Sequence, residues 1–364
     1  MRVVVIGGQG NFGARICRRL AQEEGFTIVA TSRHAAKTAS APNVERAILD
    51  IDHRGFAEQL KALAPDLVIH CAGPFQTQDY RVALASLACG AHYIDLADGR
   101  EFVVGLVAAV QSAAEAARRL AVTGASTLPA LSSAVIDSMR ESGGMASIEI
   151  FIAPGQQAPR GVATMAAVLG YAGQGFPWWQ DGAWRIAHGW QEVKRETFSF
   201  GRRLAAACDV PDLALLPERY PGVQTVTFRA ALEVSVQHWA LWLLAAVRRL
   251  GLPIPIERWA GALNRLGDWF NRFGSGTGGM KVRVTGEDMA GRRCAREWEL
   301  IAKDNCGPEI PCMAAVILAL KLRRGTELGA GAKVCMGLIS LSEFEGEFAR
   351  WNISTRVSKT SLHP

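Results

Sequence analysis

The sequence predicts an α/β protein that begins with a doubly wound parallel sheet and continues into a second, half-buried sheet. Over the first third of the chain, short β-branched runs alternate with stretches of helical periodicity, and a glycine-rich turn joins the first run to the first helical stretch. Further along, longer runs alternate apolar and polar residues, as strands with one solvated face do. With 364 residues, of which 49% are apolar, the chain can bury the cores of two domains.

The elements of the first sheet follow from these local patterns. Four stretches carry apolar residues at helical spacing, and they cover residues 13–24, 56–63, 80–89 and 99–120. The expected strands lie between them and are Arg2–Ile6, Thr27–Ala30, Val44–Ile48, Leu67–Cys71, His92–Leu96 and Ala121–Thr123. The first sheet is expected to end near Thr123.

The middle of the chain carries four further candidate strands. They alternate apolar and polar residues and cover Ser147–Ala153, Gln224–Ala231, Met280–Glu287 and Cys294–Ala302. The last two are expected to form a hairpin with its turn at Asp288–Arg292. A sheet of this size can pair with its twin across a two-fold axis, so we expect a homodimer.

The turn after the first strand has the spacing G-x-G-x-x-G, with Gly8, Gly10 and Gly13. This pattern is informative because it follows a strand and opens a helix. Gly8 permits the tight turn, Gly10 lets backbone amides approach a pyrophosphate, and Gly13 lets helix and strand pack closely. Asn11 and Phe12 lie inside the same cradle. The alternative is a sharp bend that holds no ligand.

The end of the second strand favours NADP over NAD. An enzyme that prefers NAD usually places an acidic residue here to bind the ribose hydroxyls. This strand instead ends in Ser32 and Arg33, whose hydroxyl and guanidinium suit a 2′-phosphate through charge-assisted hydrogen bonds. A solvated surface arginine is the alternative for Arg33.

Two further stretches fit the same crevice. Asp50 and Ile51, after the third strand, are expected along the adenine, although an aspartate in an exposed turn is nearly as good an interpretation. The stretch Ala72-Gly73-Pro74-Phe75 leaves the backbone bare where the cofactor would pass, and the proline stops the fourth strand.

Composition excludes several classes of protein. The net charge of +6 comes with arginines in scattered pairs, which argues against nucleic acid as a partner. The eight cysteines lie far apart with no metal-ligand spacing, so we expect reduced thiols, no metal and a cytoplasmic protein. The first strand begins at Arg2, which leaves no room for a signal peptide. The longest strongly apolar stretch, Trp239–Val247, is too short to span a membrane.

Several stretches together resemble the saccharopine dehydrogenase-like (saccharopine reductase-like) oxidoreductases. They are "GGQGNFG", "CAGPF" with "VALASLACGAHYIDLADGREF", "TGASTLPALSSAVID", and "GGMKVRVTG" with "CGPEIPCMAAVILALKL". The resemblance implies a Rossmann-type dinucleotide-binding domain at 1–128, an α+β substrate and dimerisation domain at 129–310, and a segment at 311–364 that returns to the first domain. This sequence departs from the family pattern at Ala130 and in the stretch from Asp98 to Glu101.

The expected chemistry is hydride transfer, which needs a proton source beside the nicotinamide. Tyr93 and Asp95 share one face of the fifth strand, so Asp95 could orient a substrate amine, and Tyr93 or Glu101 could supply the proton. The alternatives are a core tyrosine and an aspartate that caps the next helix. By resemblance, Ser126 is a substrate or ribose contact. Its alternative is a cap for the helix that begins at Ser132.

The leading hypothesis is therefore an NADP-dependent oxidoreductase that transfers hydride to or from a C=N or C=O carbon of a small molecule. The alternative is a non-catalytic NADP-binding sensor or scaffold protein. Two tryptophan-rich stretches, Phe176–Trp190 and the one around Trp239–Val247, admit two interpretations. We favour a core helix with a loop packed over it, and the other is a hydrophobic substrate mouth or a helix at a membrane interface.

Overall fold

The chain forms two compact units, each described here by itself from a computed structural model. Described are residues 1–34, 43–140, 144–159, 161–252, 259–362. Unit 1 comprises Met1–Leu131 and Pro308–Phe344, and unit 2 comprises Ser132–Gly307 and Glu345–Pro364. The last part of the chain is thus divided, because residues 308–344 belong to unit 1 and the remainder belongs to unit 2.

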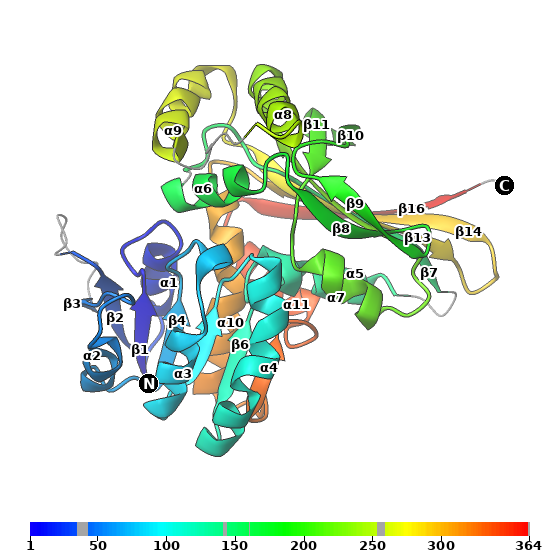
Figure 1. Cartoon of the computed structure of the whole chain (residues 1–364). Coiled ribbons are helices and arrows are strands. Elements are labelled where there is room, and N and C mark those ends of the chain that lie inside the picture. Colours follow the sequence, from blue (N-terminus) through cyan, green and yellow to red (C-terminus); the bar gives the residue numbers. More distant parts are fainter. Residues whose placement is uncertain (35–42, 141–143, 160, 253–258, 363–364) are drawn as a thin grey trace. The chain divides into compact units, whose positions relative to one another are not determined.

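Unit 1 contains a parallel sheet of seven strands in the order β15-β6-β5-β4-β1-β2-β3 (Figure 1). The predicted doubly wound sheet is confirmed, and its first six strands fall where the apolar runs placed them. Their bounds are β1 Arg2–Ile6, β2 Thr27–Ser32, β3 Val44–Ile48, β4 Leu67–His70, β5 His92–Asp95 and β6 Leu120–Thr123. The order reverses between β1 and β4, which is where a doubly wound sheet opens a crevice at the carboxyl ends of its strands.

The sheet does not end at β6, contrary to the prediction. Strand β15 (Gly331–Val334) pairs in parallel with β6 and extends the sheet by one strand. Four residues beginning with glycine and alanine carry no strand pattern of their own, so this strand forms because the exposed edge of β6 offers backbone partners.

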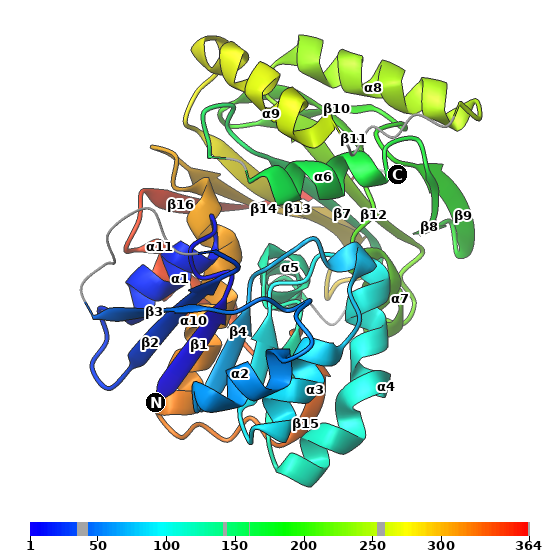
Figure 2. The same ribbon diagram turned by 60° about the vertical axis from the view of Figure 1, so that its left-hand side comes forward.

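Helices cover both faces of this sheet. On one face, α1 (Gly13–Leu20) packs against α10 (Ile310–Arg323). On the other face, α3 (Arg81–Ala88) packs between α2 (Phe56–Ala62) and α4 (Arg100–Ala117), as Figures 1 and 2 show. Because both faces are covered, the apolar residues 3–6 of β1 and 67–69 of β4 are all buried.

Unit 2 is built on a mixed sheet of nine strands. The main path runs β10-β11-β12-β7-β13-β14-β16, and the hairpin β8–β9 attaches to β12. The four strands predicted here are confirmed as β7 (Met145–Ala153), β12 (Thr225–Leu232), β13 (Gly278–Glu287) and β14 (Arg293–Ala302). The others are β8 Gly175–Gln180, β9 Ala183–His188, β10 Lys194–Phe198, β11 Gly201–Ala207 and β16 Ile353–Ser361.

Two expectations for the tryptophan-rich stretches are wrong. The first stretch is the hairpin β8–β9 rather than a loop. The helix around Trp239–Val247 is α8 (Ser235–Arg249), and it is not a core helix, because its fully buried residues are only His238 and Ala245. Within the described residues, no helix combines the length and the apolar character needed to cross a membrane.

One face of the unit 2 sheet carries a network of ion pairs. Lys281 Nζ lies 3.1 Å from Glu196 Oε1, and both side chains are only 5% exposed. Arg283, two residues further along β13, contacts Glu196 at 2.9 Å, Glu297 at 2.5 Å and Glu149 at 3.2 Å. Arg283 and Lys281 hold the pKa of Glu196 below the ordinary glutamate value despite its burial. Lys194, whose Nζ lies 2.6 Å from Glu149, and Arg283 do the same for Glu149. The network therefore depends on all of its members staying charged.

Candidate functional site

The glycine turn lies between the end of β1 and the start of α1. A methyl group at Gly8 would lie 2.7 Å from the Cα atom of Ala30, and one at Gly13 would lie 2.7 Å from the Cα atom of Gly8. Both positions must therefore be glycine for the backbone to pack. Gly10 differs, because a methyl group there would meet only the carbonyl oxygen of Gly7, at 3.1 Å. The space beside Gly10 is thus open to a ligand.

The start of α1 presents unused amides to this space. In the described part of the chain, the N–H groups of Phe12 and Gly13 have no backbone acceptor. Amides at a helix N-terminus bind anions, and the helix dipole adds to the attraction. Together with the bare Gly10, they form a cradle of the kind that a pyrophosphate occupies.

A contact from the far end of the sequence braces this turn. The Nε atom of Arg15 lies 3.0 Å from Oε1 of Glu309, and both side chains are largely buried. The same guanidinium donates to the backbone and side-chain oxygens of Asn11, at 3.1 and 3.2 Å. Cys312, in the first turn of α10, places its thiol 3.5 Å from the carbonyl oxygen of Phe12. Sequence reasoning missed these groups, and the only signal was the family-like stretch "CGPEIPC".

The ends of β2 and β3 come together at this edge of the sheet. The amide of Leu49 donates to the carbonyl oxygen of Ser32 at 3.0 Å, so Asp50 and Ile51 follow directly beside it. The Ser32 hydroxyl donates to the carbonyl oxygen of His34 at 2.6 Å, and Arg33 between them is exposed. Asp50 accepts a hydrogen bond from the amide of Asp52 at 3.1 Å, which closes a local turn.

The stretch after β4 lies against the glycine turn. A methyl group at Gly7, whose φ is +75°, would contact the backbone of Ala72 at 3.1 Å. The side chain of Gln78 holds the loop by donating to the carbonyl oxygens of Ala72, at 2.7 Å, and Pro74, at 2.9 Å. Gly73 and Pro74 are joined by a cis peptide bond. Phe75 is buried and packs edge-on against His70, so the loop can offer a ligand its backbone but not this ring.

Asp95, at the end of β5, links two neighbouring loops. Its Oδ1 atom accepts hydrogen bonds from the amides of Ala97 and Gly124, both at 2.9 Å, and from the hydroxyl of Thr123 at 3.0 Å. The side chain is fully buried, and this burial raises its pKa to about 6. The carboxylate therefore fixes the loops that follow β5 and β6 relative to each other.

Tyr93 is also fully buried, and its hydroxyl lies 3.2 Å from Nδ1 of His70. Burial lowers the pKa of this histidine to about 4, so it is neutral at physiological pH. The side chains of Tyr93 and Asp95 are thus both enclosed within unit 1 in this structure. Glu101, in the first turn of α4, is exposed. Ser126 lies in the loop after β6, where its amide donates to the carbonyl oxygen of Gly124 at 2.8 Å.

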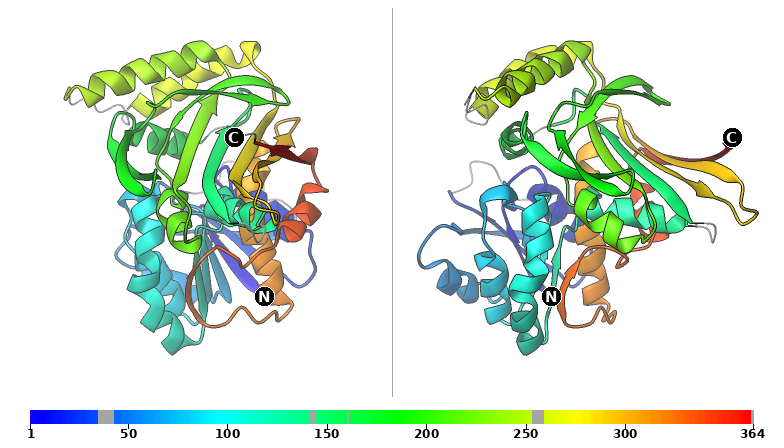
Figure 3. Two further views of the ribbon diagram at one scale, coloured as in Figure 1. Left: turned by 90° about the vertical axis from the view of Figure 1, so that its right-hand side faces the viewer. Right: turned by 45° about the vertical axis from the view of Figure 1, so that its right-hand side comes forward.

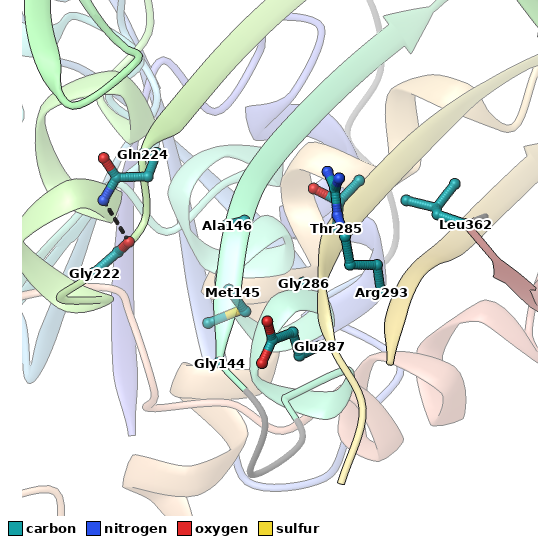
Figure 4. Close-up of a pocket in the computed structure, with 10 residues that line it drawn as sticks. All are labelled: Gly144, Met145, Ala146, Gly222, Gln224, Thr285, Gly286, Glu287, Arg293 and Leu362. Atoms are coloured by element: carbon teal, nitrogen blue, oxygen red, sulfur yellow. Dashed lines mark hydrogen bonds between the residues drawn. The ribbon is translucent and has the colours of Figure 1, made fainter. Parts of the chain in front are cut away.

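Two hollows open on unit 2. One, of about 250 Å³, lies among the ends of β7, β13 and β14, and Figure 4 shows that glycine, alanine and methionine form much of its lining. Its charged residues are Glu287 and Arg293, which face each other across the β13–β14 hairpin. The other, of about 830 Å³, has three cations, Arg203, Lys303 and Arg356, against the single carboxylate of Glu233.

Metal ligands do not gather anywhere in the residues that the structure describes, where no group of three or more His, Cys, Asp or Glu side chains could hold an ion. All eight cysteines fall within the described ranges and are free thiols. Burial raises the pKa of most of them, including Cys17 and Cys312 beside the glycine turn. Cys17 and Cys312 are therefore protonated thiols that pack beside the turn.

One protein-family model matches the first part of the chain. Residues 3–134 match the family model of the saccharopine dehydrogenase NADP binding domain. No curated protein matches the sequence.

Solved structures with the same fold cover nearly the whole chain. An apo saccharopine dehydrogenase (L-Glu forming) from Saccharomyces cerevisiae matches with a TM-score of 0.67 and 11% identity, over 99% of this chain and all of that one. The homospermidine synthase of Legionella pneumophila, in complex with NAD, matches with a TM-score of 0.65 and 11% identity, over 99% and 91% of the two chains. An engineered D-amino acid dehydrogenase bound to NADP+ matches with a TM-score of 0.51 and 16% identity, over 96% and 99%.

Proposed function

We propose, because residues 3–134 match the family model of the saccharopine dehydrogenase NADP-binding domain, that this protein is an NADP-dependent oxidoreductase. It transfers hydride to or from a C=N or C=O carbon of a small molecule. The observation that carries the proposal is the cradle at Gly10. Packing within the protein does not require glycine at this position, and the space beside it is open to a ligand. NADPH, when bound, supplies the hydride.

The residues at the edge of the sheet fit such a cofactor. The amides of Phe12 and Gly13 bind the pyrophosphate, and the helix dipole of α1 supports its charge. Arg15 and Glu309 hold the turn in its open shape through Asn11. The exposed Arg33 and the neighbouring Ser32 bind the 2′-phosphate of the adenosine, while Asp50 and Ile51 line the adenine.

The buried groups beyond the cradle orient the reacting end. Asp95 ties together the loops after β5 and β6, one of which carries Ser126. We therefore assign Asp95 and Tyr93 a positioning role. Ser126 remains the proposed substrate contact. Glu101, whose side chain is exposed whereas those of Tyr93 and Asp95 are buried, is the proposed proton carrier.

The names of the matching structures favour nitrogen chemistry over the reduction of a carbonyl group alone. They mention L-glutamate, homospermidine and a D-amino acid, each of which is an amine. A carbon attached to nitrogen is therefore the first choice for the hydride acceptor.

The test has two stages. Calorimetry with nucleotide-free protein should detect NADPH binding that is at least tenfold tighter than NADH binding, since only NADPH has the 2′-phosphate for Arg33. Consumption of NADPH is then followed by absorbance with keto acids plus amines, and separately with aldehydes. Binding without consumption across the panel would favour a non-catalytic sensor or scaffold, which the burial of Tyr93 and Asp95 keeps as the second candidate. The absence of binding to either nucleotide refutes both candidates.

A further inference from the structure

Exposed apolar side chains gather in one part of unit 2. Among the described residues, eighteen large apolar side chains are exposed, and nine of them lie between residues 236 and 273. They are Val236, Trp239, Leu243, Leu250, Leu252, Trp259, Leu266, Trp269 and Phe273. Single exposed apolar residues are ordinary, but a concentration of this kind marks a surface that binds something.

Helix α9 (Ala260–Trp269) and the short helix η4 (Phe270–Phe273) that continues it show the pattern most clearly. The exposed residues Trp259, Ala262, Leu266, Trp269 and Phe273 follow one another at intervals of three and four. This spacing places them in one stripe along the helix. The four large side chains of the stripe are between 46% and 62% exposed. The apolar stripe of this helix thus faces solvent, whereas a helix of a globular protein normally turns it inward.

Helix α8 repeats the arrangement. Val236, Trp239 and Leu243 lie at the same spacing on its exposed side, and Leu250 extends the row. The helix is attached to the sheet through β11 and β12, and α9 is attached to α6 (Val162–Gly170). Figure 2 shows α8 and α9 as neighbouring helices along one border of unit 2.

Positive charge accompanies the apolar stripes. Over residues 235–252 and 259–273 the chain has three exposed arginines, at 249, 265 and 272, and one acidic residue, Asp268. A fourth arginine, Arg248, points inward and donates to the carbonyl oxygens of Leu169 and Gly170. The guanidinium of Arg272 lies 4.7 Å from the ring centroids of both Trp269 and Phe273. An arginine held beside aromatic rings at the rim of an apolar surface keeps its charge where phosphate headgroups lie.

We propose that the exposed faces of α8 and α9 bind the surface of a membrane that contains anionic phospholipid. Tryptophan, leucine and phenylalanine enter the boundary between headgroups and acyl chains, and the arginines contact the lipid phosphates. Helices of fifteen and ten residues are too short to cross a bilayer but have a suitable length to lie in its surface. A second copy of the chain is a poorer occupant, because a two-fold contact would bring together two surfaces that both carry net positive charge.

The experiment measures binding of the full chain to vesicles by flotation. Vesicles of phosphatidylcholine alone are compared with vesicles containing 30 mol% phosphatidylserine. We expect the protein to float with the second kind, with at least tenfold weaker binding to the first and loss of binding at high salt. Failure to bind either kind of vesicle overturns the proposal.

Two double variants test the assignment to these helices. Trp269→Ser with Phe273→Ser should weaken vesicle binding at least fivefold. Met289→Ser with Val357→Ser, two even more exposed apolar sites elsewhere in unit 2, should leave it unchanged. Because all four side chains are more than 60% exposed, thermal unfolding should change little, and it is measured to confirm this. Equal binding by both double variants overturns the proposal.

A charge variant separates lipid from protein as the occupant. Arg265→Glu with Arg272→Glu should reduce binding to the anionic vesicles at least tenfold. Arg195→Glu with Arg324→Glu changes the net charge of the chain equally and should not. If Trp269→Ser with Phe273→Ser instead converts a dimer into a monomer in sedimentation without vesicles, the face is an interface between copies and the lipid assignment is wrong.

Discussion

Gly13→Ala should destabilise the fold, whereas Gly10→Ala should weaken NADPH binding with little change in stability, because the first glycine is needed for packing and the second leaves space for a ligand. At Gly13 the new methyl group would lie 2.7 Å from the Cα atom of Gly8 and would also clash with the carbonyl oxygen of Gly7. Both are backbone atoms that cannot turn aside. We expect a loss of about 2–3 kcal/mol, seen as a fall of roughly 4–12 °C in Tm.

At Gly10 the methyl group would meet only the Gly7 carbonyl oxygen at 3.1 Å, which a shift of a few tenths of an ångström relieves. The Tm should therefore change by less than about 2 °C, which corresponds to under 1 kcal/mol. The methyl group would nevertheless fill the space beside the unused amides, so NADPH should bind at least tenfold more weakly, by about 1.4 kcal/mol.

The assay combines thermal unfolding with calorimetric titration of NADPH below the transition. Gly346→Ala is the control for binding, since a methyl group there has no neighbour within 4 Å, and it should leave the NADPH affinity unchanged. Because Gly346 lies inside α11 (Leu341–Phe348), this variant should be more stable by about 0.5–1 kcal/mol rather than less stable. An unchanged NADPH affinity in the Gly10→Ala protein would refute the reasoning, because the cradle would then not hold the cofactor. An unchanged Tm for Gly13→Ala would show that the turn packs differently from this structure.

Three further predictions follow from single side chains. Arg33→Gln should weaken NADPH binding by about 1–3 kcal/mol and change NADH binding less than twofold in calorimetry, and equal losses for both would remove the case for a 2′-phosphate contact. Asp95→Asn keeps an acceptor oxygen but cannot ionise. The pKa of Asp95 is raised from 3.8 to about 6 in the folded chain, so the wild-type protein should lose stability relative to this variant as the pH rises from about 4 to 6. The expected loss in unfolding free energy is about 3 kcal/mol. A difference between the two proteins that stays constant over this pH range contradicts the assignment. Glu196→Ala leaves the buried Lys281 without its 3.1 Å partner and should lower the unfolding free energy in denaturant titrations by about 3 kcal/mol, whereas a loss below about 1 kcal/mol would show that Arg283 and Glu297 dominate the network.

The sequence predicted those parts of the fold that depend on local pattern. Strands β1 and β4 are runs of apolar residues bounded by turns, so their positions follow from the residues themselves. Strand β16 could not be found in this way, because its nine residues alternate weakly and most are exposed. It exists because β14 offers its edge, and Figure 3 shows the two side by side. A strand of this kind depends on its partner and not on its own sequence pattern, so it could not be predicted locally.

The candidate site likewise has parts that follow from local sequence and parts that depend on distant contacts. The glycine turn was visible in the sequence, since three glycines at fixed spacing have a local geometric cause. The brace from Arg15 to Glu309 was not, because the two residues lie far apart in the chain and each is unremarkable alone. The alternation of β5 correctly put Tyr93 and Asp95 on one face but could not show that helices cover both faces of this sheet, so that neither side chain reaches solvent.

The seventh strand has a consequence for how the protein is made. Strand β6 is synthesised more than two hundred residues before β15, its neighbour, and Arg15, which braces the glycine turn, is synthesised nearly three hundred residues before Glu309. The ribosome therefore synthesises unit 2 up to Gly307 before it synthesises the segment 308–344 that completes unit 1. Expression of residues 1–131 alone would leave the edge of β6 bare and α1 without α10, so a fragment cut at the end of the first segment of unit 1 should aggregate rather than bind nucleotide.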